Sequence, residues 1–303
     1  MSRLFCLGLG YTSRRLALEL RDEGWQVTGT VRDPARIADL AHDGIEAVAF
    51  GSEAAASLLS QSTHVIDSIP PVPGEAPLPL VHHAATLTRL EDLSWLAYLS
   101  TTGVYGDRQG NWVDESDEAA PATERGARRI AAEQAWFIMH ERYGLPVHVF
   151  RLAGIYGPGR GVLEQVRAGK ARRIIKPGQV FSRIHVDDIV ATLKASIARP
   201  SPGAIYNVCD DEPESPALVT EYACRLLGVT APRPVAFADA DLSTMAASFY
   251  ADNKRVSNRK IREELGVRLR YPTYREGLAA LADSSSPSSV RPRSARSESR
   301  DNR

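Results

Sequence analysis

Cysteine is scarce in this chain of 303 residues, which contains three, Cys6, Cys209 and Cys224, far apart in the sequence. A disulfide framework or a Cys-x-x-Cys metal site needs closer spacing, so we expect neither, and Cys6 fits a small core residue. The adjacent His82 and His83 would point about 100° apart on a helix, and no third ligand is near them in sequence. The sequence therefore predicts no metal site.

Net charge and long apolar runs are also absent. Lysine plus arginine and aspartate plus glutamate each total 37, which leaves no excess charge to attract nucleic acid or an anionic membrane. No segment approaches the ~18 apolar residues of a membrane helix, and Arg14 and Arg15 interrupt the N-terminal stretch that a signal peptide would need. We therefore predict a cytoplasmic protein without nucleic-acid or membrane partners, whose 43% apolar residues suffice for a large core.

The informative stretch lies at the N-terminus, where an apolar run at residues 4–7 meets Gly8 and Gly10, and a helical pattern follows at once. Gly8 permits a tight turn, and Gly10 lets the backbone approach a pyrophosphate without a Cβ in the way. Free N–H groups and the positive end of the helix dipole at the helix start favour phosphate. We therefore predict a dinucleotide site, whose further candidate residues are Tyr11, Thr12, Ser13 and Ser68.

The end of the second predicted strand, residues 25–31, bears on the choice of dinucleotide. A site for NAD usually places an acid there, which binds the ribose 2′-hydroxyl. This chain has Arg32, which suits a 2′-phosphate, followed by Asp33, which can serve the ribose. We predict NADP as the preferred cofactor, with NAD as the alternative.

Short apolar runs that alternate with helical patterns are typical of an α/β fold with a doubly wound, Rossmann-like parallel sheet. Further strands are expected at residues 44–50, 64–69 and 95–100, with a helix at 78–90. A proline-rich loop at 70–74 follows the fourth strand and cannot continue a sheet or a helix. Such sheets bind ligands at this edge, so we expect the loop to border the site.

The chain divides into three parts by pattern and composition. Residues 1–160 form the predicted dinucleotide-binding domain, and 161–282 form mainly a smaller substrate lobe, with 181–208 returning to the main sheet. Residues 283–303 are Ser, Arg and Pro with almost nothing apolar, which predicts a disordered tail. The later helices are expected at 189–197, capped by Asp187 and Asp188, and at 220–227, 252–265 and 274–281.

Several short motifs then occur in an order that resembles one family. They follow the glycine turn at residues 99–107, 151–160, 184–188 and 206–208. With them, the chain resembles the extended short-chain dehydrogenases/reductases, a family of nucleotide-sugar epimerases, dehydratases and reductases. In that family a Ser or Thr of the first motif hydrogen-bonds the reacting oxygen, so the resemblance implies this role for Thr101.

The family's catalytic helix carries Tyr-x-x-x-Lys, in which the tyrosine is the general acid/base and the lysine holds the cofactor ribose. When Glu133 is matched to the acid that usually follows the lysine by four residues, Arg125 stands at the tyrosine and Arg129 at the lysine. Arginine stays protonated in proteins, so Arg125 cannot replace a phenol, although Arg129 can still donate to ribose hydroxyls. The chain therefore resembles an atypical branch of the family that lacks the tyrosine.

These residues together predict an NAD(P)-dependent oxidoreductase of atypical extended type, acting on a small carbonyl or sugar-like substrate. Thr101 would polarise the substrate oxygen, Arg129 would stand for the lysine, and the proton would come from Tyr105, Tyr156 or water. A non-catalytic NADP-binding sensor or interaction module is the alternative, and it explains the lost tyrosine. A sugar-nucleotide epimerase or dehydratase fits less well, because it requires the phenol.

The resemblance also implies a homodimer, since many relatives pair through the helices near residues 80–92 and 125–142. Trp136 and Phe137 on the second helix fit such an interface, and they fit a core equally well.

Overall fold

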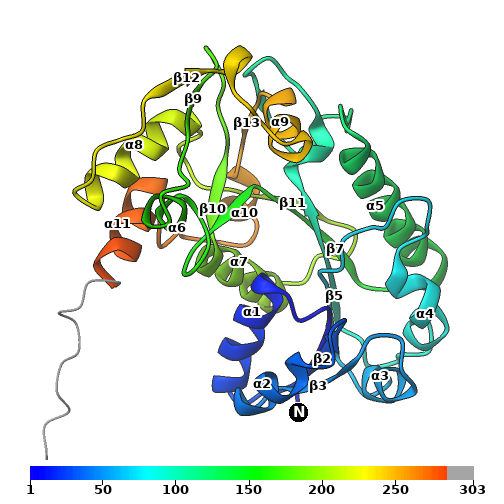
Figure 1. The fold of residues 1–303 in the computed structure, drawn as a ribbon. Helices are drawn as coiled ribbons and strands as arrows, with labels where there is room; N and C mark the ends of the chain where they lie inside the picture. Colours follow the sequence, from blue (N-terminus) through cyan, green and yellow to red (C-terminus); the bar gives the residue numbers. More distant parts are fainter. Residues whose placement is uncertain (285–303) are drawn as a thin grey trace, which may run out of the picture.

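The computed structural model describes residues 1–284, and its central feature is a seven-stranded sheet in which all neighbouring strands are parallel (Figure 1). The strands lie in the order β3-β2-β1-β4-β5-β7-β11. The order reverses between β1 and β4, which opens a crevice at the carboxyl ends of the strands. The strand bounds are β1 Arg3–Leu7, β2 Gln26–Val31, β3 Glu46–Ala49, β4 His64–Asp67, β5 Trp95–Thr101, β7 Val147–Leu152 and β11 Ile205–Val208.

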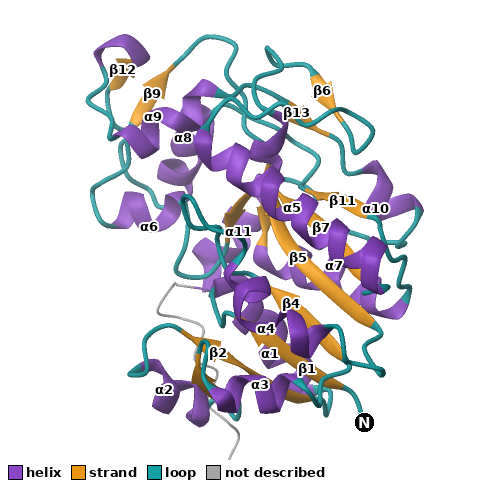
Figure 2. Ribbon diagram, turned by 90° about the vertical axis from the view of Figure 1, so that its right-hand side faces the viewer, coloured by secondary structure: helices purple, strands orange, loops and turns teal. Residues whose placement is uncertain are grey.

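Helices cover both faces of this sheet (Figure 2). Alternate residues of β1 point to opposite faces, so that Leu4 and Cys6 join one apolar core while Phe5 and Leu7 join the other. The first core includes side chains of α1 (Tyr11–Asp22), α2 (Arg36–His42) and α7 (Val186–Ala198). The second includes side chains of α3 (Glu53–Leu59), α4 (Leu78–Leu87) and α5 (Glu124–Tyr143). The predicted α/β, doubly wound, Rossmann-like fold is confirmed.

A smaller lobe has an apolar cluster of its own, which includes Tyr156, Leu163, Val219, Tyr274 and Leu278. Its short strands pair in parallel as β8–β10 and β9–β12. Helix α7 packs on α1 and β11 joins the main sheet, whereas β10 stays in the lobe. The bounds in this part are β8 Gly154–Tyr156, α6 Val162–Arg167, β9 Arg173–Ile175, β10 Arg183–His185, α8 Pro216–Leu226, β12 Pro234–Ala236, α9 Thr244–Ala251 and α11 Tyr274–Ser284.

The helix expected at residues 252–265 is wrong. This segment contains the short strand β13 (Arg255–Val256), which pairs with β6 (Trp112–Val113), and then the helix α10 (Arg259–Glu263). The backbone N–H of Arg255 donates to the carbonyl of Asn111 over 2.9 Å, so a partner more than 140 residues away in sequence overrides the local helical pattern.

The capping expected at the start of α7 is also wrong. The N-cap is His185, whose Nδ1 accepts from the backbone N–H of Asp187 over 3.2 Å. Asp188 is buried and instead accepts from the backbone N–H of Arg270 over 2.6 Å, while Asp187 forms an ion pair with Arg15 at 2.9 Å. Both aspartates therefore join α7 to other elements and leave its own cap to the histidine.

The described residues, 1–284, bear on three further features of the chain: membrane-spanning helices, the cysteines and the C-terminal tail. Within residues 1–284, no helix combines the length and the apolar character needed to cross a bilayer. The three cysteines are free and buried, with Cys6 inside the core as expected. Helix α11 continues to Ser284, and the rest of the predicted tail, residues 285–303, lies outside the described residues.

Helix α5 is fixed to the sheet by a buried ion pair. The Glu133 carboxylate accepts three hydrogen bonds from the Arg151 guanidinium of β7, and the shortest distance is 2.8 Å. Ser100 of β5 also donates to Glu133. Both charged side chains are buried, with exposed fractions of 4% for Glu133 and 6% for Arg151. Trp136, one turn further along, is fully buried and donates to Asp67 of β4 over 3.1 Å, which places it in the core. The ion pair and the indole together set how α5 lies on the sheet.

Replacing Glu133 with alanine is expected to lower the free energy of unfolding by about 3–5 kcal/mol, because it leaves the Arg151 cation buried without a counter-charge. The matched control is Glu124→Ala on the same helix, since the Glu124 side chain also pairs with an arginine but is 93% exposed. Urea denaturation of both variants measures the difference. Equal, small changes in the two variants would show that the buried pair does not hold α5.

Candidate functional site

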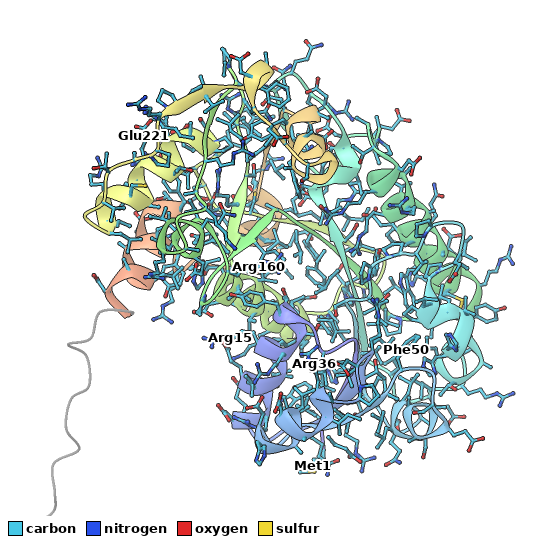
Figure 3. The ribbon with its side chains drawn as sticks, viewed as in Figure 1. Met1, Arg15, Arg36, Phe50, Arg160 and Glu221 are labelled. Carbon is cyan, nitrogen blue, oxygen red and sulfur yellow. The ribbon has the colours of Figure 1, made fainter. Side chains whose placement is uncertain are left out.

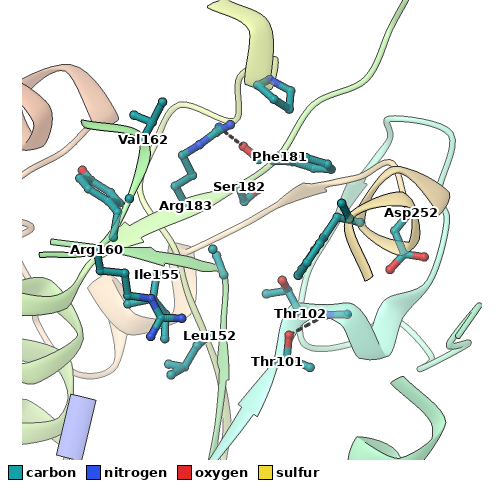
Figure 4. A pocket seen from close by; sticks show the side chains of 18 of the residues that line it. Thr101, Thr102, Leu152, Ile155, Arg160, Val162, Phe181, Ser182, Arg183 and Asp252 are labelled. Atoms are coloured by element: carbon teal, nitrogen blue, oxygen red, sulfur yellow. Dashed lines mark hydrogen bonds between the residues drawn. The ribbon is translucent and has the colours of Figure 1, made fainter. Parts of the chain in front are cut away.

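A cavity of about 1230 Å³ lies at the carboxyl ends of the strands, between the main sheet and the smaller lobe (Figure 4). Its walls come from the glycine turn, the ends of β4, β5 and β7, the first turns of α5, and elements of the lobe. Of the predicted site residues, the cavity brings together Gly10, Tyr11, Thr12, Ser13, Ser68, Thr101 and Arg129. Gly8, Arg32 and Tyr105 do not line it.

The glycine turn has the geometry that its sequence predicts. Gly8 adopts a φ of +89°, and a Cβ on it would lie 3.0 Å from the Ile69 side chain, so only glycine fits. Gly10 is the N-cap of α1 and provides no side-chain cap. The first backbone N–H groups of α1, at Tyr11 and Thr12, therefore stay available to an anion in the cavity.

Two serines hold this turn against β4. Ser13 donates to Ser68 over 2.7 Å, and Ser68 donates in turn to the carbonyl of Gly8 over 2.7 Å. A small residue at position 13 lets helix and strand approach closely, as expected from the pattern. Both serines line the cavity, so they position the turn and also face the space in front of it.

The end of β2 carries the residues that bear on cofactor choice. Arg32 is exposed, and its guanidinium forms no hydrogen bond or ion pair with the residues that the structure describes. The Asp33 carboxylate accepts from the N–H of Ala35 over 3.0 Å. Arg36, which the sequence analysis missed, donates to the carbonyl of Leu9 over 3.0 Å and so lies beside the turn (Figure 3). The sequence signal for this residue was a second arginine four positions after Arg32, at the start of α2.

Thr101 is at the end of β5, where the strand gives way to the short 3-10 turn Thr102–Tyr105. Its hydroxyl oxygen accepts from the N–H of Gly103 over 3.2 Å and caps that turn (Figure 4). The hydroxyl hydrogen remains available, and Thr102 lines the same wall. This wall therefore offers hydroxyl donors to a substrate oxygen.

The two arginines that stand for the family's Tyr and Lys differ in their contacts. Arg129 donates to the phenol oxygen of Tyr98 over 3.0 Å and to the carbonyl of Leu99 over 2.8 Å. Its guanidinium thus lies against the end of β5. Arg125 has its guanidinium carbon 5.6 Å from the centre of the Phe249 ring on α9. Both line the cavity.

The tyrosines expected to supply a proton lie in different places. Tyr105 is fully buried, donates to Asn207 over 2.9 Å and does not line the cavity, so the structure does not bring it to Thr101. Tyr156 does line the cavity, but burial raises the pKa of its phenol well above the usual range. A phenol with a raised pKa is a weak proton donor near neutral pH.

Lys254, which belongs to none of the sequence motifs, also lines the cavity. Its ammonium donates to the carbonyl of Gly106 over 2.9 Å and pairs with Asp252 at 3.1 Å. Burial lowers the pKa of Lys254 from its ordinary value. No local pattern marks this residue, because its place depends on the pairing of β13 with β6.

Behind the cavity floor lies a buried carboxyl group, Asp67, at the end of β4. It accepts from the backbone N–H of Ile69 over 2.9 Å and from Trp136 over 3.1 Å. Burial raises the pKa of Asp67 to about 7 despite these donors. The folded protein therefore keeps a proton that the unfolded chain loses near pH 4.

Stability should consequently fall as pH rises from about 4 to about 7, by at most about 1.4 kcal/mol per pH unit from this group. Asp67→Asn removes the titration, so the variant should gain stability relative to the native protein across this window. Urea denaturation of both proteins at several pH values gives the difference directly. A difference that does not change with pH would contradict the shifted pKa.

Comparison with known proteins bears on this geometry. Residues 8–209 match the model of the NAD dependent epimerase/dehydratase family. The chain belongs to this family. The resemblance to the extended dehydrogenases/reductases, drawn from the order of the short motifs, is thereby confirmed.

One curated relative and two solved structures match nearly the whole chain. Protein YeeZ of Escherichia coli (strain K12) is 29% identical over 287 residues, covering 90% of this chain and 97% of YeeZ. The structure of a functionally unknown conserved protein from Silicibacter pomeroyi DSS is 49% identical, with a TM-score of 0.88, covering 94% of this chain and 99% of that one. The dTDP-glucose 4,6-dehydratase of Bacillus anthracis str. Ames, solved in complex with NAD, shares the fold at 17% identity, with a TM-score of 0.73 over 93% of this chain and 96% of that one.

Proposed function

We propose that this member of the family is an NAD(P)-dependent oxidoreductase that acts on a small carbonyl or sugar-like substrate. One observation carries the proposal: the uncapped start of α1 and the hydroxyl of Thr101 open into the same cavity. A phosphate site and a donor for a carbonyl oxygen are thus joined in a single space. That combination suits a reaction between a dinucleotide and a substrate.

The residues present fit a dinucleotide. Gly10 leaves room for a pyrophosphate against the first N–H groups of α1, and the Ser13–Ser68 pair keeps the turn in place. Arg129 is fixed by Tyr98 and Leu99, so its remaining N–H groups can reach ribose hydroxyls. When bound, the nicotinamide ring supplies or accepts the hydride.

Around that ring, the chain's own residues would orient the substrate and move a proton. The Thr101 hydroxyl would hydrogen-bond the substrate oxygen and hold it at the end of β5. Of the expected proton sources, water and Tyr156 can reach the cavity, although the raised pKa of Tyr156 makes it the weaker donor. Lys254 is a further candidate, because burial lowers the pKa of its ammonium.

A non-catalytic NADP-binding sensor is the second candidate function, and Arg125 at the tyrosine position is the observation that favours it. Calorimetric titration with NADPH and NADH, followed by absorbance at 340 nm with a panel of carbonyl compounds, separates the two. Substrate-dependent loss of absorbance supports the oxidoreductase. Dinucleotide binding without any such loss supports the sensor, and absence of dinucleotide binding overturns both.

For the oxidoreductase, Thr101→Val is expected to lower kcat/KM about hundredfold, because it removes the donor to the reacting oxygen. Thr101→Ser keeps a hydroxyl and should restore most of the rate. The dissociation constant for NADPH should be the same in all three proteins, which controls for folding. A valine variant as active as the native protein would remove Thr101 from the proposed role.

The preference for NADP is tested at the end of β2. Arg32→Ala should weaken NADPH binding about tenfold, since a charged partner of the 2′-phosphate is lost, and should leave NADH binding unchanged. Arg36→Ala is the matched comparison, because Arg36 supports the turn through Leu9 and its loss should weaken both dinucleotides alike. Equal NADPH binding before and after Arg32→Ala would contradict the preference.

A further inference from the structure

The cavity has a strong excess of positive charge that the chain as a whole lacks. Among the residues that the structure describes, seven cationic side chains line it, whereas Asp252 is the one acidic residue in the lining and already pairs with Lys254. The whole sequence, by contrast, has 37 residues of each sign. The cationic residues are Arg125, Arg129, Arg160, Lys170, Arg172, Arg183 and Lys254.

Most of these cations have partners within the chain. Arg129 donates to Leu99, Arg172 donates to the carbonyl of Asp241, and Arg183 donates to the carbonyl of Phe181. The Arg125 guanidinium, in contrast, has no hydrogen bond or ion pair within the described part of the chain. Its contact is the face of Phe249, a ring that is 52% exposed.

Arg125 is exposed, but its electrostatic surroundings disfavour its positive charge. It lies in the first turn of α5, where the positive end of the helix dipole disfavours a cation. Desolvation lowers the pKa of Arg125, and the neighbouring charges of Arg129, Arg128 and Arg160 lower it further. Each of these effects would be relieved by an anion placed at the guanidinium.

Arg160 approaches the same cavity from the loop after β8 (Figure 4). Its guanidinium carbon lies 5.2 Å from the centre of the Tyr11 ring, and its guanidinium likewise has no hydrogen bond or ion pair among residues 1–284. Two unpaired guanidinium groups thus face one space from different elements. A planar guanidinium presents parallel N–H groups that match the two oxygens of a carboxylate or phosphoryl group.

We propose that Arg125 is the centre of an oxyanion-binding subsite, so that the substrate carries a carboxylate or phosphoryl group near its reacting carbonyl carbon. The proposal rests on the proposed oxidoreductase function. Thr101 and Thr102 would take the carbonyl oxygen, while Arg125 takes the neighbouring anion with Phe249 behind it. Arg125 thereby binds substrate and moves no proton.

Three probes test the subsite by calorimetry on protein already saturated with NADP⁺, so that sites for the cofactor phosphates are filled and no hydride is available to reduce a probe. Pyruvate carries a carboxylate beside its carbonyl, acetylphosphonate carries a phosphonate there, and methyl pyruvate is neutral. We expect at least one charged probe to bind about tenfold or more tightly than the neutral ester. The better of the two charged probes identifies the oxyanion as carboxylate or phosphoryl.

Arg125→Gln should remove this preference by weakening the charged probe about tenfold or more, and Arg125→Lys should restore part of it. Arg128→Gln is the matched control, because Arg128 lies on the same helix but pairs with Glu124 and does not line the cavity. It should bind the probes as the native protein does.

Three results would overturn the subsite: equal binding of charged and neutral probes, no binding of either charged probe at millimolar concentration, or unchanged binding in Arg125→Gln. NADPH binding is measured first in every protein. If the native protein does not bind NADPH, the proposed function itself is overturned. Failure of the subsite and failure of the proposed function therefore give different results.

Discussion

The buried pair of Glu133 and Arg151 is the constraint on which the geometry of the site depends. It joins α5 to β7, and through Ser100 it also joins α5 to β5. Burying two opposite charges costs solvation free energy, which is offset only if both stay in register and hydrogen-bonded. The helix therefore cannot slide on the sheet without separating the charges. Because Arg125 and Arg129 are on the first turns of this helix and Thr101 ends β5, one ion pair fixes the distance between both walls of the cavity.

The fold could be predicted in large part because it depends on local patterns. The apolar runs of β1, β4 and β5 and the glycine turn mark a parallel sheet whatever the rest of the chain does. The start of α1 could be predicted for the same reason, since the conformation of Gly8 and the open amides after Gly10 follow from the residues themselves. The part of the cavity around the glycine turn was thus visible in the sequence.

The other half of the site depends on contacts that no local pattern records. Residues 252–265 have a helical pattern, yet β13 forms because β6 offers it backbone partners. Lys254 reaches the cavity only as a result of that pairing. Tyr105 illustrates the opposite case: its motif placed it near the substrate, but its hydroxyl finds Asn207 inside the core. The direction in which a side chain points at the end of a strand therefore depends on its packing contacts.

Because β13 lies late in the chain, its pairing with β6 affects the order in which the walls of the cavity form during synthesis. The first 160 residues contain the glycine turn and most strands of the sheet, so this part of the fold is synthesised early. The cavity, however, takes part of its wall from Lys254, Tyr274 and Leu278. A ribosome must therefore synthesise nearly the entire chain before this wall of the cavity can form. Any truncation before β13 leaves the glycine turn and most of the sheet with a cavity that is open on one side.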